Sequence, residues 1–373
     1  MHQHAIRIDR KQPLAAEPHK GHNRYHPDIA PVLEVAEGEE LVLETRDALD
    51  GQLGPDATIA DLATVDANLV HPLTGPVFVK GAEPGDMLEV EFLDIVPQPT
   101  AFSAIVPGLG FLRDVMTAPF VVNWKIKDGY ATSAQLPGVR IPGAPFMGIS
   151  ATAPSAQKLK EWTAREQRAI EAGGFALPPD EKSAVPRGRC AIEGLRTLPP
   201  RENGGNFDVK QLTRGSKLML PVFTSGALFS TGDAHFAQGD GEVCVTAVEM
   251  GATAAVRFKI HKGLAQKRTF AGPVFAHPGA FADAKYALPQ NFTGVMGMPI
   301  NAEGEIESEN LTLAARNAVL NMMTLLQERG FSREQAYVIC SVAVDLRISN
   351  VVDVPNYVVS ALLPEAISAG TSA

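Results

Sequence analysis

Five polar side chains that could do chemistry lie close together in the stretch GALFSTGDAHFAQGDGEVCVTAVEM (residues 226–250). They are Asp233, His235, Gln238, Asp240 and Glu242. Glycines separate them, and an apolar run follows at residues 243–248. Asp233 and His235 are two residues apart, so in an extended chain their side chains leave on the same face. A carboxylate and an imidazole on one face are a common beginning of a divalent metal site, usually one for zinc.

The same stretch offers a proton-transfer group, and the rest of the chain offers distant ligands. Glu242 follows Asp240 at the same-face spacing after a glycine-permitted turn, so we expect Glu242 to be the general acid/base and Asp240 its alternative. His71 and Asp47 each lie near the end of a predicted strand and are the best distant metal ligands. Metal-assisted hydrolysis needs two or three such ligands, an open position for water and a nearby carboxylate.

Each of these residues also has a structural interpretation. Asp240 precedes a glycine, which is common in turns. His235 could be a hydrogen-bonded loop histidine, and His71 and Asp47 could equally be structural.

Four further polar residues could join the site. Asp208 ends the glycine turn RENGGNFD (residues 201–208), where it could cap the turn. Asn206 could orient an amide or bond to the local backbone. His22 and His26, in HNRYHPD (residues 22–28), are expected at the surface, although a long loop could bring either inward.

Composition narrows the class of protein. The chain has 373 residues, 45% hydrophobic and 20% charged, with a net charge of −9 and no run of Lys and Arg, so nucleic acid is not an expected partner. Three widely spaced cysteines fit a reducing compartment better than a disulfide framework. No signal-peptide pattern opens the chain, and no apolar run has the length of a membrane helix. We therefore expect a cytoplasmic protein without a membrane partner.

The order of predicted elements indicates an α+β fold, with β-rich, sandwich-like sheets in the front two-thirds and helices at the C-terminal end. We expect strands at 32–45, 217–222, 243–248, 253–260 and 267–276, and a hairpin of 77–79 and 88–96 about the turn 82–86. Helices are expected at 157–172, within 306–329 up to Gly330, and from an N-cap at Ser332 to about 344. No linker is visible, so residues 1–373 are predicted to be one catalytic unit, with a partly disordered tail at 1–20 and an exposed excursion at 178–201.

Other amide-cleaving arrangements have little support. The sequence contains no G-x-S-x-G elbow, no H-E-x-x-H motif and no Ser-Ser pair. Cys244 lies two residues after Glu242, and on a strand both would point the same way, so a Cys nucleophile with a Glu base is an alternative. A buried apolar role for this cysteine is the competing interpretation.

At these residues the sequence resembles the acetamidase/formamidase family, and the resemblance spans nearly the whole chain. It is carried by long blocks in the expected order: HNRYHPD, ETRDALDGQ, VHPLTGPVFVKGAEPGDMLEVE, IPGAPFMG, RENGGNFDVKQLTRGS, GDAHFAQGDGEVC and SVAVDLRISNVVDVPNY. The resemblance implies hydrolysis of short amides such as formamide and acetamide by a cytoplasmic homo-oligomer. It also implies zinc, and relatives that act on γ-lactams.

The resulting hypothesis is a hydrolase that uses zinc or another divalent metal, held by Asp233 and His235 with His71, Asp47 or both. Glu242 would activate water and return the proton to the departing nitrogen. The amide would be held by Gln238 or Asn206, and Phe236 would narrow the pocket or pack beneath it. The loops 106–111 and 141–148 would enclose a small apolar pocket that excludes longer acyl chains. The alternative from another class is a non-catalytic protein that binds a metal or a small molecule.

Overall fold

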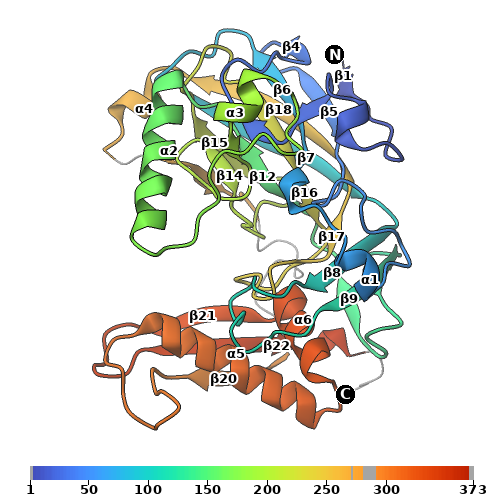
Figure 1. The fold of residues 1–373 in the computed structure, drawn as a ribbon, viewed down its shortest axis with the longest axis vertical. Helices are drawn as coiled ribbons and strands as arrows, with labels where there is room; N and C mark the ends of the chain where they lie inside the picture. Colours follow the sequence, from blue (N-terminus) through green and yellow to red (C-terminus); the bar gives the residue numbers. More distant parts are fainter. Residues whose placement is uncertain (1–2, 270–271, 280–290, 369–373) are drawn as a thin grey trace.

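The computed structural model describes residues 3–269, 272–279 and 291–368, and their strands form two large sheets and two small ones (Figure 1). The first large sheet is antiparallel except for its β1–β5 edge, which is parallel. Its strand order is β1 (Gln3–Ile6), β5 (Glu40–Glu44), β18 (Ala252–His261), β7 (Met87–Pro97), β15 (Lys217–Pro221) and β19 (Val274–Ala276). Buried and partly exposed residues alternate along β5 and β18, as expected for a sheet with one face in the core.

The second large sheet carries the residues of the 226–250 stretch. Its main path is β11 (Arg140–Pro142), β10 (Tyr130–Thr132), β9 (Phe120–Lys127), β8 (Thr100–Ile105), β17 (Glu249–Met250), β16 (Phe229–His235), β12 (Phe146–Ala151) and β14 (Gly204–Asn206). β16 also pairs with β6 (Leu73–Val79), which in turn pairs with β2 (Gly21–His22) and β4 (Leu33–Val35). Every residue of β12 and β16 is buried, so both faces of these central strands are covered.

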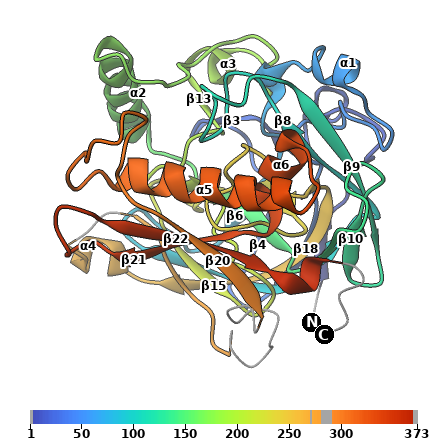
Figure 2. The same ribbon diagram turned by 90° about the horizontal axis from the view of Figure 1, so that it is seen from below.

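The C-terminal part places two helices against a small sheet. This sheet has the order β20 (Phe292–Gly297), β22 (Val358–Pro364), β21 (Asp345–Asn350), and α5 (Leu311–Glu328) packs along it (Figure 2). α6 (Arg333–Ala343) lies between α5 and the second large sheet (Figure 1). One continuous apolar core contains buried residues from both parts, such as Phe229 of β16 and Tyr337 of α6.

The remaining elements are short apart from α2 and lie on the periphery. They are α1 (Ile59–Leu62), α2 (Ala156–Glu171), α3 (Arg189–Glu193), α4 (Leu264–Lys267), the 3-10 turns η1 (Leu14–Ala16), η2 (Ala67–Leu69) and η5 (Glu365–Ile367), and the pair β3 (Arg24–Tyr25) with β13 (Leu195–Arg196). None of the helices in the described ranges is long and apolar enough to cross a membrane.

The α+β fold is confirmed, and local capping explains why the helix ends were predictable. Gly330, with φ +97°, follows the end of α5 at a conformation that favours glycine. Ser332 accepts a hydrogen bond from the Gln335 N–H while the Gln335 side chain returns to the Ser332 N–H, which makes a complete capping box for α6. The predicted strands 217–222 and 253–260 and the helix 157–172 are also present, within a residue or two of the predicted bounds.

The predicted hairpin at 77–96 is wrong. Both strands exist, but β6 pairs with β16 in one large sheet while β7 pairs with β15 and β18 in the other. The turn residues do form a tight turn, in which Asp86 accepts the N–H of Glu83. The turn therefore carries the chain from one sheet to the next instead of folding it back.

The strand predicted at 243–248 is also wrong, because this apolar run is a buried loop. Side chains of α6 take the place of a neighbouring strand as its hydrogen-bond partners. The Tyr337 hydroxyl donates to the carbonyl of Val243, and the Ser341 hydroxyl accepts the N–H of Cys244 at 3.1 Å and donates to the carbonyl of Thr246 at 2.6 Å. The apolar composition of residues 243–248 therefore indicates that they are buried, and does not indicate an extended backbone.

Three other boundaries differ from expectation. In place of a disordered tail, residues 3–20 contain β1, paired with β5, and η1. Within 178–201 residues 180–182 and 187–189 are exposed, but Val185 and Leu195 are buried, so only part of this segment is an excursion. In the predicted strand 267–276, only β19 is extended among the described residues, and residues 270–271 lie outside them.

Candidate active site

The core of the site is the C-terminal end of β16, which places Asp233 and His235 side by side. The Nε2 atom of His235 lies 3.5 Å from Oδ1 of Asp233. Asp233 has φ +53°, a left-handed conformation that Asp adopts more readily than most residues. The neighbouring strand β17 pairs Glu249 directly with His235, and its Oε2 lies 3.0 Å from His235 Nε2. A second carboxylate thus approaches the same nitrogen from the adjacent strand.

Two more carboxylates complete a buried ring about His235. Oε1 of Glu242, from the loop after β16, lies 3.9 Å from His235 Nε2. Oδ1 of Asp208, from the loop after β14, lies 4.0 Å from His235 Nδ1. Gly148 of β12 permits this approach, because a Cβ at this position would lie 2.6 Å from Asp208 Oδ1 and 3.0 Å from His235 Cε1.

Gln238 fixes the orientation of the imidazole. Its Nε2 donates to the carbonyl of Asp208 at 2.8 Å, which turns Oε1 toward His235 Nδ1 at 2.9 Å. Because the amide oxygen can only accept, the Nδ1 atom of His235 carries the proton in this bond. The other ring nitrogen is therefore the one that faces the carboxylates of Asp233 and Glu249.

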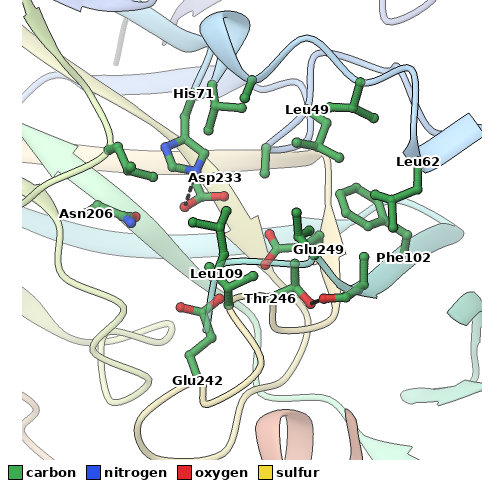
Figure 3. Close-up of a pocket in the computed structure, with 18 of the residues that line it drawn as sticks. Leu49, Leu62, His71, Phe102, Leu109, Asn206, Asp233, Glu242, Thr246 and Glu249 are labelled. Carbon is green, nitrogen blue, oxygen red and sulfur yellow. Dashed lines mark hydrogen bonds and ion pairs between the residues drawn. The ribbon is translucent and has the colours of Figure 1, made fainter. Parts of the chain in front are cut away.

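His71 and Asn206 border the same space. Nε2 of His71 lies 3.9 Å from Oδ2 of Asp233, and its backbone is anchored by Thr197, whose hydroxyl accepts the His71 N–H at 2.7 Å. The Oδ1 atom of Asn206 is buried and has no hydrogen-bond partner among the described residues. Figure 3 shows both side chains on the same side of a cavity as Asp233.

The electrostatics of the cluster separate its carboxylates into two kinds. Burial raises the pKa of Glu242 to about 8 and that of Glu249 to about 7, although the charge of His235 opposes both shifts. Burial, followed by repulsion from Glu242, holds the pKa of Asp208 well above its usual range. Burial would also raise the pKa of Asp233, but the charges of the two neighbouring imidazoles lower it to about 2.

The pKa values of the two histidines shift in opposite directions. Burial lowers the pKa of His71, although the carboxylate of Asp233 opposes this shift. Burial alone would also lower the pKa of His235, but the carboxylates of Glu249 and Asp233 raise it well above its ordinary value. His235 is therefore the positive charge that holds the carboxylates together when no cation is bound.

The residues present fit a divalent cation. Two groups of residues could each hold a cation, Asp208 with Asp233 and His235, and His235 with Glu242 and Glu249. Within each group the possible ligand atoms lie within 4.8 Å of one another. Asp208 Oδ1 is buried and lacks a hydrogen-bond partner among the described residues, and His235 Nε2 and Glu249 Oε2 form an ion pair at 3.0 Å without an aligned hydrogen bond. Carboxylate oxygens with imidazole nitrogen are ligands of zinc and of other divalent metals.

Of the nine residues given a role from sequence, six meet at this site and three do not, and Asp208, raised as a further member, also lies there. Asp233, His235, His71, Glu242, Gln238 and Asn206 are the ones that meet.

The other three are elsewhere. Asp47 caps its own turn, where its Oδ1 accepts the N–H of Leu49 and of Gly51. Asp240 faces Lys210 at 3.7 Å and Arg347 at 3.5 Å. Phe236 packs its ring against Gly143, which is the second of the two roles expected for it.

Sequence reasoning missed Glu249 entirely. The available signal was a lone carboxylate inside the apolar sequence VCVTAVEMGATAAV, because such a group is rarely buried without a partner. His22 and His26 are buried, against the expectation that they lie at the surface. His22 is bonded to the Ser230 hydroxyl at 2.7 Å, and His26 lies 3.5 Å from Glu193. Neither belongs to the ligand groups around His235.

A cavity of about 390 Å³ opens onto Asp233, Glu242 and Glu249 (Figure 3). Most of its wall is apolar and is formed by Ala48, Leu49, Leu62, Val65, Ala67, Val70, Phe102, Ala104, Val106, Leu109, Phe175, Leu177, Leu198 and Val245. The polar residues of the wall are His71, Arg196, Asn206, Asp233, Glu242, Thr246 and Glu249. The loop 106–111 thus contributes to the wall as expected, whereas no residue of 141–148 is among those lining it. The cavity is also larger than the small pocket expected from sequence.

A pocket with a few convergent polar groups and strongly shifted carboxyl pKa values at one end is the arrangement of an enzyme site. The chain belongs to the Acetamidase/Formamidase family, whose model matches residues 7–369. It is 36% identical over 359 residues to the acetamidase of Mycolicibacterium smegmatis, covering 89% of this chain and 87% of the relative. It is 34% identical over 367 residues to the formamidase of Methylophilus methylotrophus, covering 93% and 89%.

Solved structures agree with this membership. The fold matches a gamma lactamase from Delftia acidovorans with a TM-score of 0.90 and 34% identity, over 98% of this chain and 93% of the other. An acetamidase from Bacillus halodurans matches with a TM-score of 0.56 and 25% identity, over 97% of each chain.

Proposed function

We propose that this protein is an amidase that hydrolyses the C–N bond of small amides, linear or cyclic, to a carboxylate and ammonia or an amine. The named activities of the relatives support the reaction class. The observation that carries the proposal is the position of Glu242, a partly buried carboxyl at the cavity wall, 3.9 Å from the His235 nitrogen that faces the possible metal ligands.

The metal part of the proposal rests on the donor set. Asp233 and His235 would hold a divalent cation, most simply zinc, with Asp208 completing the set. Glu249 faces the same nitrogen of His235 and groups with it and Glu242 as a second possible set. His71 contacts Asp233 and could add a further nitrogen ligand. When bound, such a cation supplies Lewis-acid polarisation of the amide carbonyl and of water.

Glu242 would move the proton. In the hydrolysis, the oxygen of water bonds to the carbonyl carbon, the C–N bond breaks, and the nitrogen leaves with one proton that came from the water. A carboxyl whose pKa is raised toward neutrality can take this proton and then donate it. Glu242 satisfies both requirements because its surroundings raise its pKa and it still borders the cavity.

Asn206 would hold the substrate amide. Its unpartnered Oδ1 can accept an N–H from the leaving nitrogen. Gln238 is already engaged at both ends, with His235 and with the Asp208 carbonyl, so it serves as a positioning residue. The Lys210 and Arg347 partners of Asp240 make it the weaker candidate for the acid/base role.

The experiment that tests the proposal is turnover of formamide, acetamide and 2-pyrrolidinone by the zinc-supplied full chain and by Glu242→Gln. Loss of a general acid/base lowers kcat by about 100-fold or more. Glu202→Gln is the matched control, because Glu202 pairs with Arg165 at a partly exposed position and is not among the residues lining the cavity. If the native protein cleaved none of the three compounds, the non-catalytic binding protein would be the better interpretation.

A further inference from the structure

The cavity beside the carboxylate cluster has two chemically different ends. His71, Asp233 and Asn206 lie at one end, whereas Leu49, Leu62 and Phe102 lie together at the other (Figure 3). A substrate whose amide reaches Glu242 must therefore direct whatever is attached to the amide toward apolar side chains.

The size of the apolar end exceeds what the simplest amides can fill. At the liquid volume of about 30 Å³ per water, a cavity of about 390 Å³ has room for about 13 waters. Formamide and acetamide are each comparable to only two or three waters. They would leave most of the apolar wall in contact with solvent, so its burial would contribute nothing to their binding.

The apolar end is built from fixed side chains. Leu62 and Phe102 are buried in one cluster with Ala48, Ala104 and Val121, and Leu49 packs against it. The short helix α1, which carries Leu62, is held by a capping box between Thr58 and Asp61. Such a pocket is formed before a substrate arrives, and preformed apolar pockets gain affinity from ligands that fill them.

We propose, on the basis of the amidase activity inferred above, that the preferred substrates are amides with a compact apolar acyl group of about five to eight carbons. Branched chains, saturated rings and phenyl groups have this form. The carbonyl carbon lies toward Glu242, and the apolar group contacts Leu49, Leu62 and Phe102. Leu49, Leu62 and Phe102 are then the residues that determine acyl specificity.

The test compares kcat/KM of the zinc-supplied full chain for formamide, acetamide, hexanamide and cyclohexanecarboxamide. Each buried methylene raises kcat/KM by about threefold or more, so the value for cyclohexanecarboxamide, with five more carbons, is expected to exceed that for acetamide by at least about 200-fold. If formamide and acetamide are cleaved and the larger amides give no higher kcat/KM, the acyl-group proposal is overturned while the amidase proposal stands. If neither these four nor 2-pyrrolidinone is cleaved, the amidase proposal fails and this one fails with it.

A pair of variants tests the location of the acyl group. Leu49→Trp fills part of the apolar end, and the ratio of kcat/KM for cyclohexanecarboxamide over acetamide is expected to fall at least about tenfold. Ile59→Trp is the matched control, because Ile59 lies on α1, the helix that carries Leu62, but is 48% exposed and is not among the residues lining the cavity. Its ratio is expected to equal that of the native chain. An unchanged ratio in a folded Leu49→Trp protein would contradict the placement.

Discussion

The Nε2 atom of His235 lies 3.0 Å from Oε2 of Glu249, and the two residues are directly paired across β16 and β17. One oxygen of Glu249 is fixed by the Ala247 N–H at 2.8 Å, which leaves the other toward the imidazole. The pairing of two strands thus sets the relative position of an imidazole and a carboxylate. In the proposed site His235 and Glu249 are both possible metal ligands.

Glu249→Gln should separate stability from function. Burial holds the pKa of this carboxyl at about 7, so the metal-free native protein at pH 8 carries an ionised group whose burial is unfavourable. Its removal should stabilise the metal-free protein at pH 8 by up to about 3 kcal/mol. It should also weaken zinc binding and lower kcat/KM by about 100-fold. Urea unfolding and amide turnover on the same preparation measure both. A variant that is less stable and fully active would contradict this role.

Gln238→Leu should act through the orientation of His235. The variant keeps the size of the side chain but cannot accept the Nδ1–H of His235. Loss of such a supporting hydrogen bond typically lowers metal affinity by 10–100-fold. Competition with a chromophoric zinc chelator measures this affinity independently of turnover. Gln238→Asn, which retains the amide on a shorter side chain, should recover part of the loss if orientation is the cause.

Cys244→Ala should leave amide turnover within about twofold of the native protein. The Cys244 Sγ is buried against the carbonyls of Ala104 and Thr246, it is not among the residues lining the cavity, and burial raises the pKa of its thiol. A nucleophilic cysteine needs the opposite environment. Steady-state kinetics with acetamide measures the turnover of the variant. Mass spectrometry of the native protein tests for an acylated cysteine. Loss of turnover in a folded variant would favour the nucleophile alternative.

His22 should make the stability of the protein fall at mildly acidic pH. Burial lowers the pKa of this imidazole to about 4, against 6.5 for the ordinary group. Between these two values the unfolded chain binds a proton that the native protein does not, so the free energy of unfolding decreases as pH falls from 6.5 to 4 and levels off below.

The measurement is urea unfolding of the native chain and of His22→Gln at pH 7 and pH 4. Gln can keep a hydrogen bond to the Ser230 hydroxyl but does not titrate. The native chain should lose about 3 kcal/mol more than the variant over this interval. Equal losses would show that the buried imidazole does not set the acid sensitivity.

Much of the fold could be predicted because its signals are local. The ends of α5 and α6 follow from Gly330 and from the capping box of Ser332, which act within a few residues. The contact of Asp233 with His235 was also predicted, although simple alternation is not its cause, because Asp233 has φ +53°. The loop 243–248 could not be predicted in this way, because a buried loop and a buried strand have the same composition and only the partners in α6 distinguish them.

The remaining site residues come together through long-range pairing. Glu249 reaches His235 through strand pairing, and Asp208 reaches it through the loop after β14, which no spacing in the sequence reveals. The same-face argument for Asp240 and Glu242 failed for a local reason. Gly241 and Glu242 have φ values of +95° and +43°, so the backbone is not extended and alternation does not apply. Asp240 therefore faces Lys210, whereas Glu242 faces the cavity.

The central claim is that a divalent cation held beside His235 is required for amide hydrolysis. The most direct measurement is a zinc titration of chelator-treated full-length protein, with bound zinc and acetamide turnover determined at every point. The account predicts negligible turnover without metal and an increase in proportion to zinc bound with high affinity. Full turnover by protein shown by elemental analysis to be free of metal would contradict it.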